Sequence, residues 1–372
     1  MIVTERERFS AVMDYQPFDR VPVLYFGIWG ETWPLWKAQG ISAWNAIPRE
    51  TGMDEDWEEG SWGCQGLVDN RPRALCEATV LEETATYKIA RTNMGAVLKH
   101  RKDGPSIPQH LEEALKPTRE SWKNFKKCLD GAAADRTPAD RETKLAAFNA
   151  RKRPASFLAG SLFGWPREWM GVEQWSFLAY DDPAMYEDII ATVTDFFIEI
   201  HRPFLNRTKF EVAYFFEDCC GRSGPMFSPE MYWRFYHKHY SRLIAFYRSC
   251  GVQHILLDSD GVVDPLIPCW MESGVDLLFP IEVGTWKASP ITIRQKYGKA
   301  LRMMGGVNKH VLTEGPEAVR RSLEPLVPLV KEGGYVPMPD HRIPPMVSLA
   351  QFRDYVRVFK EVFSEPGGGG AA

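Results

Sequence analysis

The chain has 372 residues, of which 44% are hydrophobic and 25% charged, as in ordinary globular proteins, and its net charge of −4 lacks the basic excess of nucleic-acid binders. It contains no apolar run long enough to span a membrane, and its charged N-terminus is unlike a signal peptide. With seven thinly spread cysteines, these features predict a cytoplasmic protein with reduced thiols that binds neither nucleic acid nor membranes.

Residues 1–150 are predicted to form an N-terminal extension, and the first 75 are rich in tryptophan. Trp29 and Trp33 are predicted to bind substrate, since an indole ring offers a flat apolar surface, although such residues more often belong to the core. The other tryptophans of the extension are Trp36, Trp44, Trp57 and Trp62. Apolar and polar residues alternate over residues 79–101 on either side of Asn93-Met94-Gly95, which predicts a β-hairpin. Residues 103–150 are predicted to form surface helices.

The segment 151–363 alternates short apolar runs with amphipathic stretches. The runs are residues 155–159, 212–216, 254–257, 276–279, 301–304 and 335–338, and an earlier one is 21–26. Short buried strands that alternate with helices predict an α/β fold with a parallel sheet. Their number favours a (β/α)8 TIM barrel spanning 1–365 as one domain, followed by a disordered tail at 366–372. A doubly wound open sheet is the alternative, which the lack of a glycine-rich nucleotide motif weakens.

Polar side chains follow nearly every one of these runs. They include Glu217, Asp258, Asp260, Glu282, Asn308 and His341. In a TIM barrel the chemistry lies where the strands end, so these side chains are expected to converge on one mouth. Carboxylates gathered there repel each other unless a cation, a proton or a basic substrate lies among them. Lys309, in the same region, either holds an anion or is an exposed loop lysine.

Asp258, Asp260 and His341 form the tightest predicted group. Side chains at i and i+2 of a strand share a face, and two carboxylates with one imidazole resemble an open three-ligand zinc site. The same residues also fit a turn, a helix cap or a structural histidine. Glu217, Asp258 and His341 are the predicted catalytic residues, and Glu282 and Asn308 are predicted to contact the substrate. A structural ion pair is the alternative role for Glu217.

Several motifs in the right order make the chain similar to the uroporphyrinogen decarboxylase superfamily. They are Arg6 with Asp19-Arg20-Val21-Pro22-Val23, Ser161-Leu162-Phe163-Gly164, the segment SPEMYWRFYHKHYSRLI, Asp258-Ser259-Asp260-Gly261, Gly305-Gly306-Val307-Asn308-Lys309 and GGYVPMPDHRIPP. Together they cover nearly the whole chain. The resemblance implies a (β/α)8 barrel whose site lies at the carboxyl ends of the strands.

The N-terminal segment separates this chain from true uroporphyrinogen decarboxylases. Those enzymes bind substrate carboxylates with an arginine-rich segment of the type RQAGRYLPEY, whereas this chain has the acidic, aromatic segment 27–36. An aromatic segment without arginines is a poor partner for a substrate with many carboxylates. The resemblance therefore points to the cobamide-dependent methyltransferase branch of the superfamily.

Some methyltransferases of that branch hold zinc with a His-x-Cys-Gly motif and a later cysteine. The matching positions here are Asp258-x-Asp260-Gly261 and His341, which contain no thiolate. Harder ligands leave more positive charge on zinc, which suits polarising the oxygen of a methyl ether. The resemblance thus implies an O-demethylating methyltransferase with zinc as Lewis acid, assisted by Glu217 or Glu282. A small methylated substrate, expected to be a methoxylated aromatic, donates its methyl group to the Co(I) corrinoid of a partner protein.

Three other functions remain open at this point. Glu217, Asp258 and His341 fit a metal-free decarboxylase or other lyase that uses general acid–base catalysis. A transfer from a methyl-corrinoid to a thiol or other acceptor, and a catalytically silent binding barrel, are the remaining alternatives. The resemblance also implies a homodimer, although no residue of the sequence indicates one.

Overall fold

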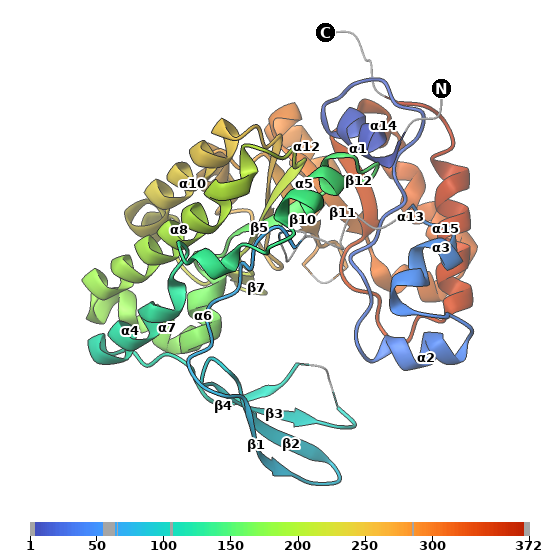
Figure 1. Ribbon diagram of the computed structural model, residues 1–372. Helices are drawn as coiled ribbons and strands as arrows, with labels where there is room; N and C mark the ends of the chain where they lie inside the picture. Colours follow the sequence, from blue (N-terminus) through green and yellow to red (C-terminus); the bar gives the residue numbers. More distant parts are fainter. Residues whose placement is uncertain (1–3, 55–63, 65, 105–106, 285, 368–372) are drawn as a thin grey trace.

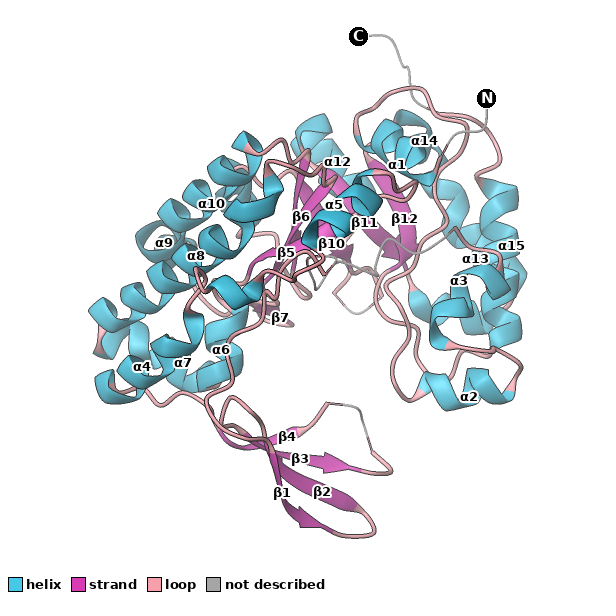
Figure 2. Cartoon of the chain, viewed as in Figure 1, coloured by secondary structure: helices cyan, strands magenta, loops and turns pink. Residues whose placement is uncertain are grey.

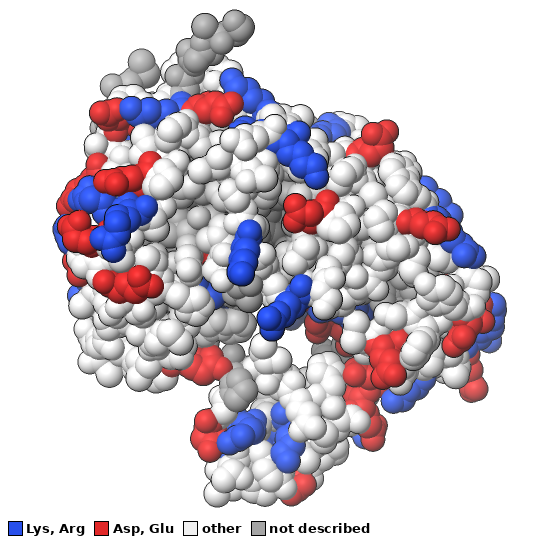
Figure 3. Space-filling model, turned by 180° about the vertical axis from the view of Figure 1, so that it is seen from behind, with Lys and Arg blue, Asp and Glu red and all other residues white. Residues whose placement is uncertain are grey.

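The computed structural model describes residues 4–54, 64, 66–104, 107–284 and 286–367 (Figure 1). Trp57 and Trp62 of the tryptophan-rich extension lie outside the described residues. Within them, no helix has the length and apolar character needed to cross a bilayer. On the face shown in Figure 3, acidic and basic side chains are interspersed, in keeping with the small net charge.

A sheet of six parallel strands lies at the centre of the fold (Figure 2). Its strands are β5 (Ser156–Gly160), β6 (Val212–Phe216), β9 (His254–Asp258), β10 (Leu277–Ile281), β11 (Arg302–Val307) and β12 (Tyr335–Pro339). All six apolar runs predicted after residue 151 are therefore confirmed as strands. Nearly every residue in them is buried, which explains why they read as continuous apolar runs and not as an alternating pattern.

The strand order distinguishes the two predicted architectures. The sheet runs β5-β6-β9-β10-β11-β12, in the order of the chain and without reversal. A doubly wound sheet reverses its order at a switch point, so that alternative is wrong. Sequential parallel strands with helices around them are the arrangement of a (β/α)8 barrel.

The apolar run 21–26 is buried but forms no regular strand. Pro22 has no N–H to donate, and the Val23 amide donates to the Asp54 carboxylate at 2.8 Å instead of to a neighbouring strand. Just after this run, the Trp29 amide donates to the Ile343 carbonyl at 3.1 Å. The chain that leaves β12 thus lies beside the N-terminal segment.

Helices surround the sheet on its outside (Figure 2). Those after β5 are α6 (Gly164–Met170), α7 (Val172–Asp181), α8 (Pro183–Leu205), α9 (Pro229–Met231), η5 (Tyr232–Tyr236, a π-helical turn), α10 (His237–Ser249), α11 (Ile267–Glu272), α12 (Pro290–Tyr297), η6 (Gly298–Ala300), η7 (Lys309–Glu314), α13 (Pro316–Leu323), η8 (Glu324–Leu326), α14 (Val327–Glu332) and α15 (Leu349–Val362). The long helix α8 begins where Asp182 caps its first turn and Pro183 occupies the first position, an arrangement that favours initiation.

The N-terminal extension contains short helices and a separate sheet. Its helices are α1 (Glu5–Met13), α2 (Thr32–Ala38), η1 (Trp44–Ala46), α3 (Ile47–Thr51), α4 (Arg119–Phe125), η3 (Lys126–Leu129), η4 (Ala134–Arg136) and α5 (Arg141–Asn149). The antiparallel sheet consists of β1 (Thr79–Glu83), β2 (Tyr87–Arg91), β3 (Val97–Arg101) and β4 (Gln109–Glu112) and projects from the rest of the molecule (Figure 1). The sequence predicted a hairpin at Asn93-Met94-Gly95, and the structure confirms it between β2 and β3 within a larger sheet.

Two short pairings complete the fold. The strands β7 (Cys220–Gly221) and β8 (Gly224–Pro225) form a small hairpin after β6. Gly367 pairs with Phe18 through two backbone hydrogen bonds of 2.9 and 3.2 Å. The described chain therefore extends two residues into the segment 366–372 that was predicted to be a disordered tail.

A buried ion cluster ties α1 to the amino-terminal ends of β9 and β10. His254 is 2% exposed, and its Nε2 and Nδ1 each lie 3.3 Å from a carboxylate oxygen, of Asp14 and Asp276 respectively. Asp276 also lies 3.2 Å from both Arg248 and Arg302. Burial lowers the pKa of His254, but the two carboxylates outweigh it and leave the pKa raised.

We expect His254→Gln to lower the free energy of unfolding by about 3 kcal/mol near pH 6, because it breaks a buried ion pair. A raised folded-state pKa gives stability that is fully present below about pH 6.5 and is lost as the pH rises through the folded value. The difference from wild type should therefore shrink above neutral pH. Urea unfolding at several pH values measures it, with exposed His310→Gln as control. A difference that does not vary with pH would contradict the role of the protonated imidazole.

Candidate functional site

The polar residues that follow the strands lie at one end of the parallel sheet. Glu217 and Asp218 follow β6, Asp258 ends β9, Glu282 follows β10, Asn308 follows β11, and Asp340 and His341 follow β12. Carboxyl ends of parallel strands meet at the same edge, so the predicted residues are grouped there. Each of these side chains has different hydrogen-bond or ion-pair partners.

Asp260 and His341 are in direct contact. The Asp260 Oδ2 lies 3.0 Å from the His341 Nε2, and the side chains are 30% and 14% exposed. The imidazole stacks on the Trp29 indole, with ring centres 5.2 Å apart and planes 27° apart, and meets the Phe26 ring edge-on. Asp260 and two aromatic rings therefore fix the orientation of His341, while the pair stays accessible from solvent.

Asp258 is placed differently from Asp260 although they are two residues apart. It is 3% exposed, and its Oδ2 accepts a hydrogen bond from the Tyr214 hydroxyl. Burial raises the pKa of Asp258 well above its usual value, and the negative charge of Asp260 raises it further. Asp258 therefore retains a proton at pH values where an exposed aspartate is ionised.

We expect Asp258→Asn to raise the free energy of unfolding at pH 8 by about 1–3 kcal/mol, because the amide removes a poorly solvated negative charge. With a raised folded-state pKa, the stabilising protonated form is complete below about pH 3.9 and is lost as the pH rises through the folded value. The gain should therefore decrease toward pH 4. Urea unfolding measures it, with exposed Asp264→Asn as control, and an equal gain at both pH values would be evidence against a retained proton.

Arg167 is a site residue that the sequence did not reveal. It lies on α6, and its Nη1 is 3.1 Å from the Asp218 Oδ2. Burial raises the pKa of Asp218, while the Arg167 charge opposes the rise. Asp218 also has a positive φ of 43°, which a non-glycine residue seldom adopts, so the turn aims its side chain at a local strain cost. The feature of the sequence that could have indicated Arg167 is its place in the first helix after a strand.

Glu217 has the contacts of a structural carboxylate. It is fully buried, and it accepts hydrogen bonds from the amides of Leu162, Phe163 and Gly164 at 2.7 to 3.0 Å and from the Tyr240 hydroxyl at 2.5 Å. Burial raises the pKa of Glu217, and these four donors lower it. The amides belong to the start of α6, so Glu217 fixes the helix that carries Arg167. Its predicted catalytic role stays a prediction.

Glu282 and Lys309 form a second pair at this edge. The Lys309 Nζ lies 3.3 Å from the Glu282 Oε1 and 3.8 Å from the Asp340 Oδ1, and Lys309 is 8% exposed. The expectation that Lys309 is an exposed loop lysine is therefore wrong, because two carboxylates draw it inward. The Glu282 Oε2 is buried and has no hydrogen-bond partner among the described residues. Burial raises the pKa of Glu282, and so does the charge of Asp260.

The other residues predicted to contact the substrate, Asn308, Trp33 and Trp29, have different surroundings. Asn308 caps the 3-10 helix η7, accepting from the His310 amide at 2.9 Å. Trp33, on α2, packs against Trp44 with ring centres 5.5 Å apart. Trp29 borders both His341 and a cavity of about 550 Å³ that Ile107 of the β3–β4 connection also lines. Of the predicted contact residues, Trp29 is therefore the one that joins an apolar surface to the Asp260–His341 pair.

The predicted zinc ligands do not form a three-ligand group here. Asp260 and His341 are in contact, whereas Asp258 is buried against Tyr214. Among the described residues, no set of three or more histidine, cysteine, aspartate or glutamate side chains is placed to hold a metal ion. The arrangement of these three side chains therefore does not fit the predicted zinc site.

Comparison with known proteins identifies the family. Residues 157–362 match the uroporphyrinogen decarboxylase (URO-D) family. A solved structure described as "methyltransferase from Methanosarcina mazei" superimposes with a TM-score of 0.59 and 16% sequence identity, over 96% of this chain and 99% of that one. This identity is low enough that the likeness shows the fold alone. No curated protein matches the chain. The family match covers more than half of the chain and confirms the resemblance seen in the sequence, so the chain belongs to the uroporphyrinogen decarboxylase family, whose fold is the TIM barrel.

Proposed function

We propose that the protein is a methyltransferase that removes a methyl group from a small methoxylated aromatic compound and passes it to the corrinoid of a separate protein. The observation that carries this proposal is the Asp260–His341 pair, which lies against the Trp29 indole at the edge of the sheet. It combines a group that can transfer a proton with a flat apolar surface. An aryl methyl ether presents both features that such a site recognises, an aromatic ring and an oxygen that must gain a proton.

His341 acts in this proposal as the proton donor to the leaving oxygen. The Asp260 carboxylate lies 3.0 Å from the Nε2 and holds the imidazole in position. In this proposal the Nδ1 carries the proton that is transferred. As the carbon–oxygen bond breaks, the electron pair stays on oxygen and the Nδ1 proton neutralises it. His341 then regains a proton from solvent.

The partner's corrinoid supplies the nucleophile that accepts the methyl group. The chain's own contribution is to orient the ether and protonate its oxygen, since a free phenoxide is a poor leaving group. Proton transfer of this kind typically contributes a factor of about 10² to 10⁴ in rate. The aromatic segment 27–36 supports this class of substrate, because it replaces the arginines that hold a many-carboxylate porphyrinogen.

A metal-free lyase is the second candidate. It is favoured by the raised pKa of Asp258, which makes this residue a buried acid beside the Asp260–His341 pair. In this case the site protonates the carbon from which carbon dioxide leaves a small aromatic acid. The same residues serve both reactions, so the products must distinguish them.

The proposal is tested with purified protein, free cobalamin reduced to Co(I), and a panel of methyl-labelled methoxyphenols and methoxybenzoates. The expected result is protein-dependent transfer of label to the cobalamin, at an unchanged rate after treatment with a metal chelator. A folded protein that transfers no label from any compound would contradict the proposal. Transfer abolished by the chelator and restored by zinc would contradict the metal-free step and favour zinc.

A further inference from the structure

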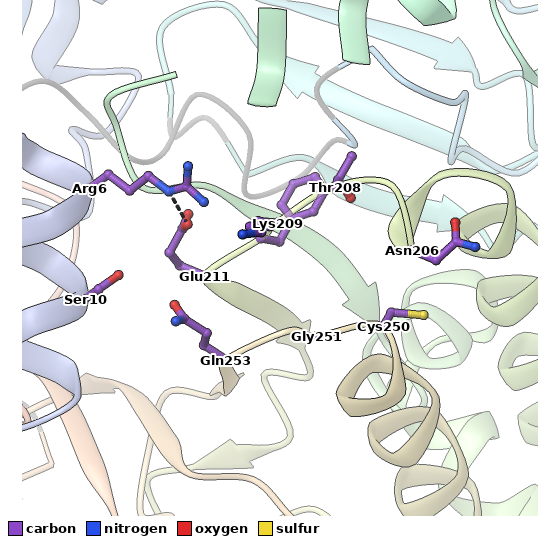
Figure 4. Close-up of a pocket in the computed structure, with 10 residues that line it drawn as sticks. Arg6, Ser10, Asn206, Thr208, Lys209, Glu211, Cys250, Gly251 and Gln253 are labelled. Carbon is purple, nitrogen blue, oxygen red and sulfur yellow. Dashed lines mark hydrogen bonds and ion pairs between the residues drawn. The ribbon is translucent and has the colours of Figure 1, made fainter. Parts of the chain in front are cut away.

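A polar recess lies at the end of the sheet opposite to the candidate site (Figure 4). Its volume is about 410 Å³. It is lined by α1, by the connection from α8 to β6, and by the turn from α10 to β9. Both connections lead into the amino-terminal ends of their strands, whereas the Asp260–His341 pair follows carboxyl ends. A ligand in this recess is therefore not the substrate of the proposed reaction.

The charge around the recess is positive. Glu211 has a side chain only 3% exposed, and it lies 2.6 Å from the Arg6 Nε and 2.7 Å from the Arg151 Nη2. It also accepts from the Ala155 amide at 2.7 Å. Two guanidinium groups therefore surround this one carboxylate, and Lys209 adds a third positive charge at the recess. Among the described residues that line the recess, Glu211 is the sole acid.

Several donors in the recess are not used by the protein itself. Arg6 contacts Glu211 through Nε, and its two terminal nitrogens have no hydrogen-bond partner within the described residues. The Lys209 ammonium likewise has no ion pair in the described chain. Figure 4 shows the Ser10 hydroxyl and the Gln253 amide on the same side of the recess as the Glu211 carboxylate. The recess thus offers guanidinium, ammonium, hydroxyl and amide donors together.

Backbone carbonyls at the ends of α8 and α10 would by themselves favour a cation, since helix C-termini are negative. Side chains already bind three of these oxygens. The Arg207 carbonyl accepts from the Asn149 Nδ2 at 3.0 Å, and the carbonyls of Lys209 and Gln253 accept from the guanidinium groups of Arg151 and Arg248. With these three carbonyls bound, the guanidinium and ammonium groups of the recess favour an anion over a cation.

We propose that this recess binds a small oxyanion, the phosphate or carboxylate group of a ligand, through the Arg6 guanidinium and the Lys209 ammonium. The parallel terminal N–H groups of an arginine match the oxygens of such a group, and a lysine adds a point charge. Arg6 lies on α1 and Lys209 on the connection from α8 to β6, so the two side chains come together only in the folded protein. Binding therefore stabilises the folded protein by an amount that rises with the logarithm of the ligand concentration once this exceeds the dissociation constant.

Calorimetric titration and thermal unfolding with inorganic phosphate and, separately, with citrate test the proposal. Ionic strength is held constant with chloride. Lys209→Ala is the informative variant, because Lys209 is exposed and its removal leaves the Glu211 contacts intact. We expect saturable binding to wild type that weakens at least about tenfold in this variant. Exposed Lys123→Ala, on α4, is the control and should bind as wild type does.

The two anions separate the sources of the ligand group. Saturation by phosphate and not citrate assigns phosphate chemistry, the reverse assigns carboxylate chemistry, and saturation by both supports a general oxyanion site. Equal unfolding temperatures of wild type and Lys209→Ala without ligand show that the variant is folded. Absence of saturable binding of either anion to wild type, or equal binding by wild type and Lys209→Ala, would overturn the proposal.

Discussion

Methyl transfer by the His341→Ala variant is expected to be about 100 to 10,000 times slower than by the wild-type protein, the usual contribution of a positioned proton donor. The loss should be confined to methyl donors whose leaving group needs a proton. A methylsulfonium ion that gives up its methyl group becomes a neutral sulfide, which needs no proton. Its demethylation should therefore be nearly unaffected by the same substitution. Initial rates of label transfer from a methoxyarene and from a methylsulfonium compound measure both effects.

The matched control is His310→Ala, which removes an exposed imidazole from the 3-10 helix η7. It should leave both rates unchanged. Asp260→Asn is expected to slow the ether reaction as well, because it weakens the contact that holds the imidazole in position. Equal loss with both kinds of methyl donor in His341→Ala would show that His341 binds substrate or shapes the site, and would contradict its role as proton donor.

The Glu217→Gln variant is expected to lose about 3 kcal/mol of unfolding free energy. Both oxygens of Glu217 accept from backbone amides, so either placement of the glutamine NH₂ leaves a buried N–H facing another donor. Tyr240→Phe removes a single donor to the same carboxylate and should lose only about 1 kcal/mol. Denaturant unfolding of the two variants beside wild type gives both values.

This pair of variants decides between the two roles of Glu217. If the carboxylate is structural, stability falls in Glu217→Gln and activity follows the fraction of folded protein. If Glu217→Gln unfolds like wild type and yet loses activity, the catalytic role predicted from the sequence is correct and the structural role is wrong.

The strands of the sheet were predictable because a parallel strand buried on both faces must be apolar throughout. The runs at 212–216 and 335–338 show this directly, and each matches its strand closely. The end of the sheet that carries the polar residues followed from the same pattern, since parallel strands share a direction. Residues 21–26 broke the rule because Pro22 cannot donate and Asp54 takes the Val23 amide, a contact between segments more than 30 residues apart.

The pairing within the site was not predictable, because it depends on contacts between distant segments. Asp258 and Asp260 were expected to bind the same ligand. The hydroxyl of Tyr214, on the neighbouring strand, donates a hydrogen bond to Asp258 instead. Lys309 is buried because it pairs with Glu282 and Asp340. Arg167 contacts Asp218 because Glu217 fixes the start of α6, the helix that carries Arg167. Periodicity and spacing carry no information about such side-chain partners.

The most direct test of methyl transfer uses a methoxybenzoate that carries one label in the methoxy carbon and a different one in the carboxyl carbon. Purified protein is incubated with this compound and Co(I) cobalamin, and both labels are followed. The proposed function predicts that the methoxy label moves to the cobalamin while the carboxyl label stays in the aromatic product. Release of the carboxyl label as carbon dioxide, with the methoxy group intact, would contradict methyl transfer and show that the site is a decarboxylase.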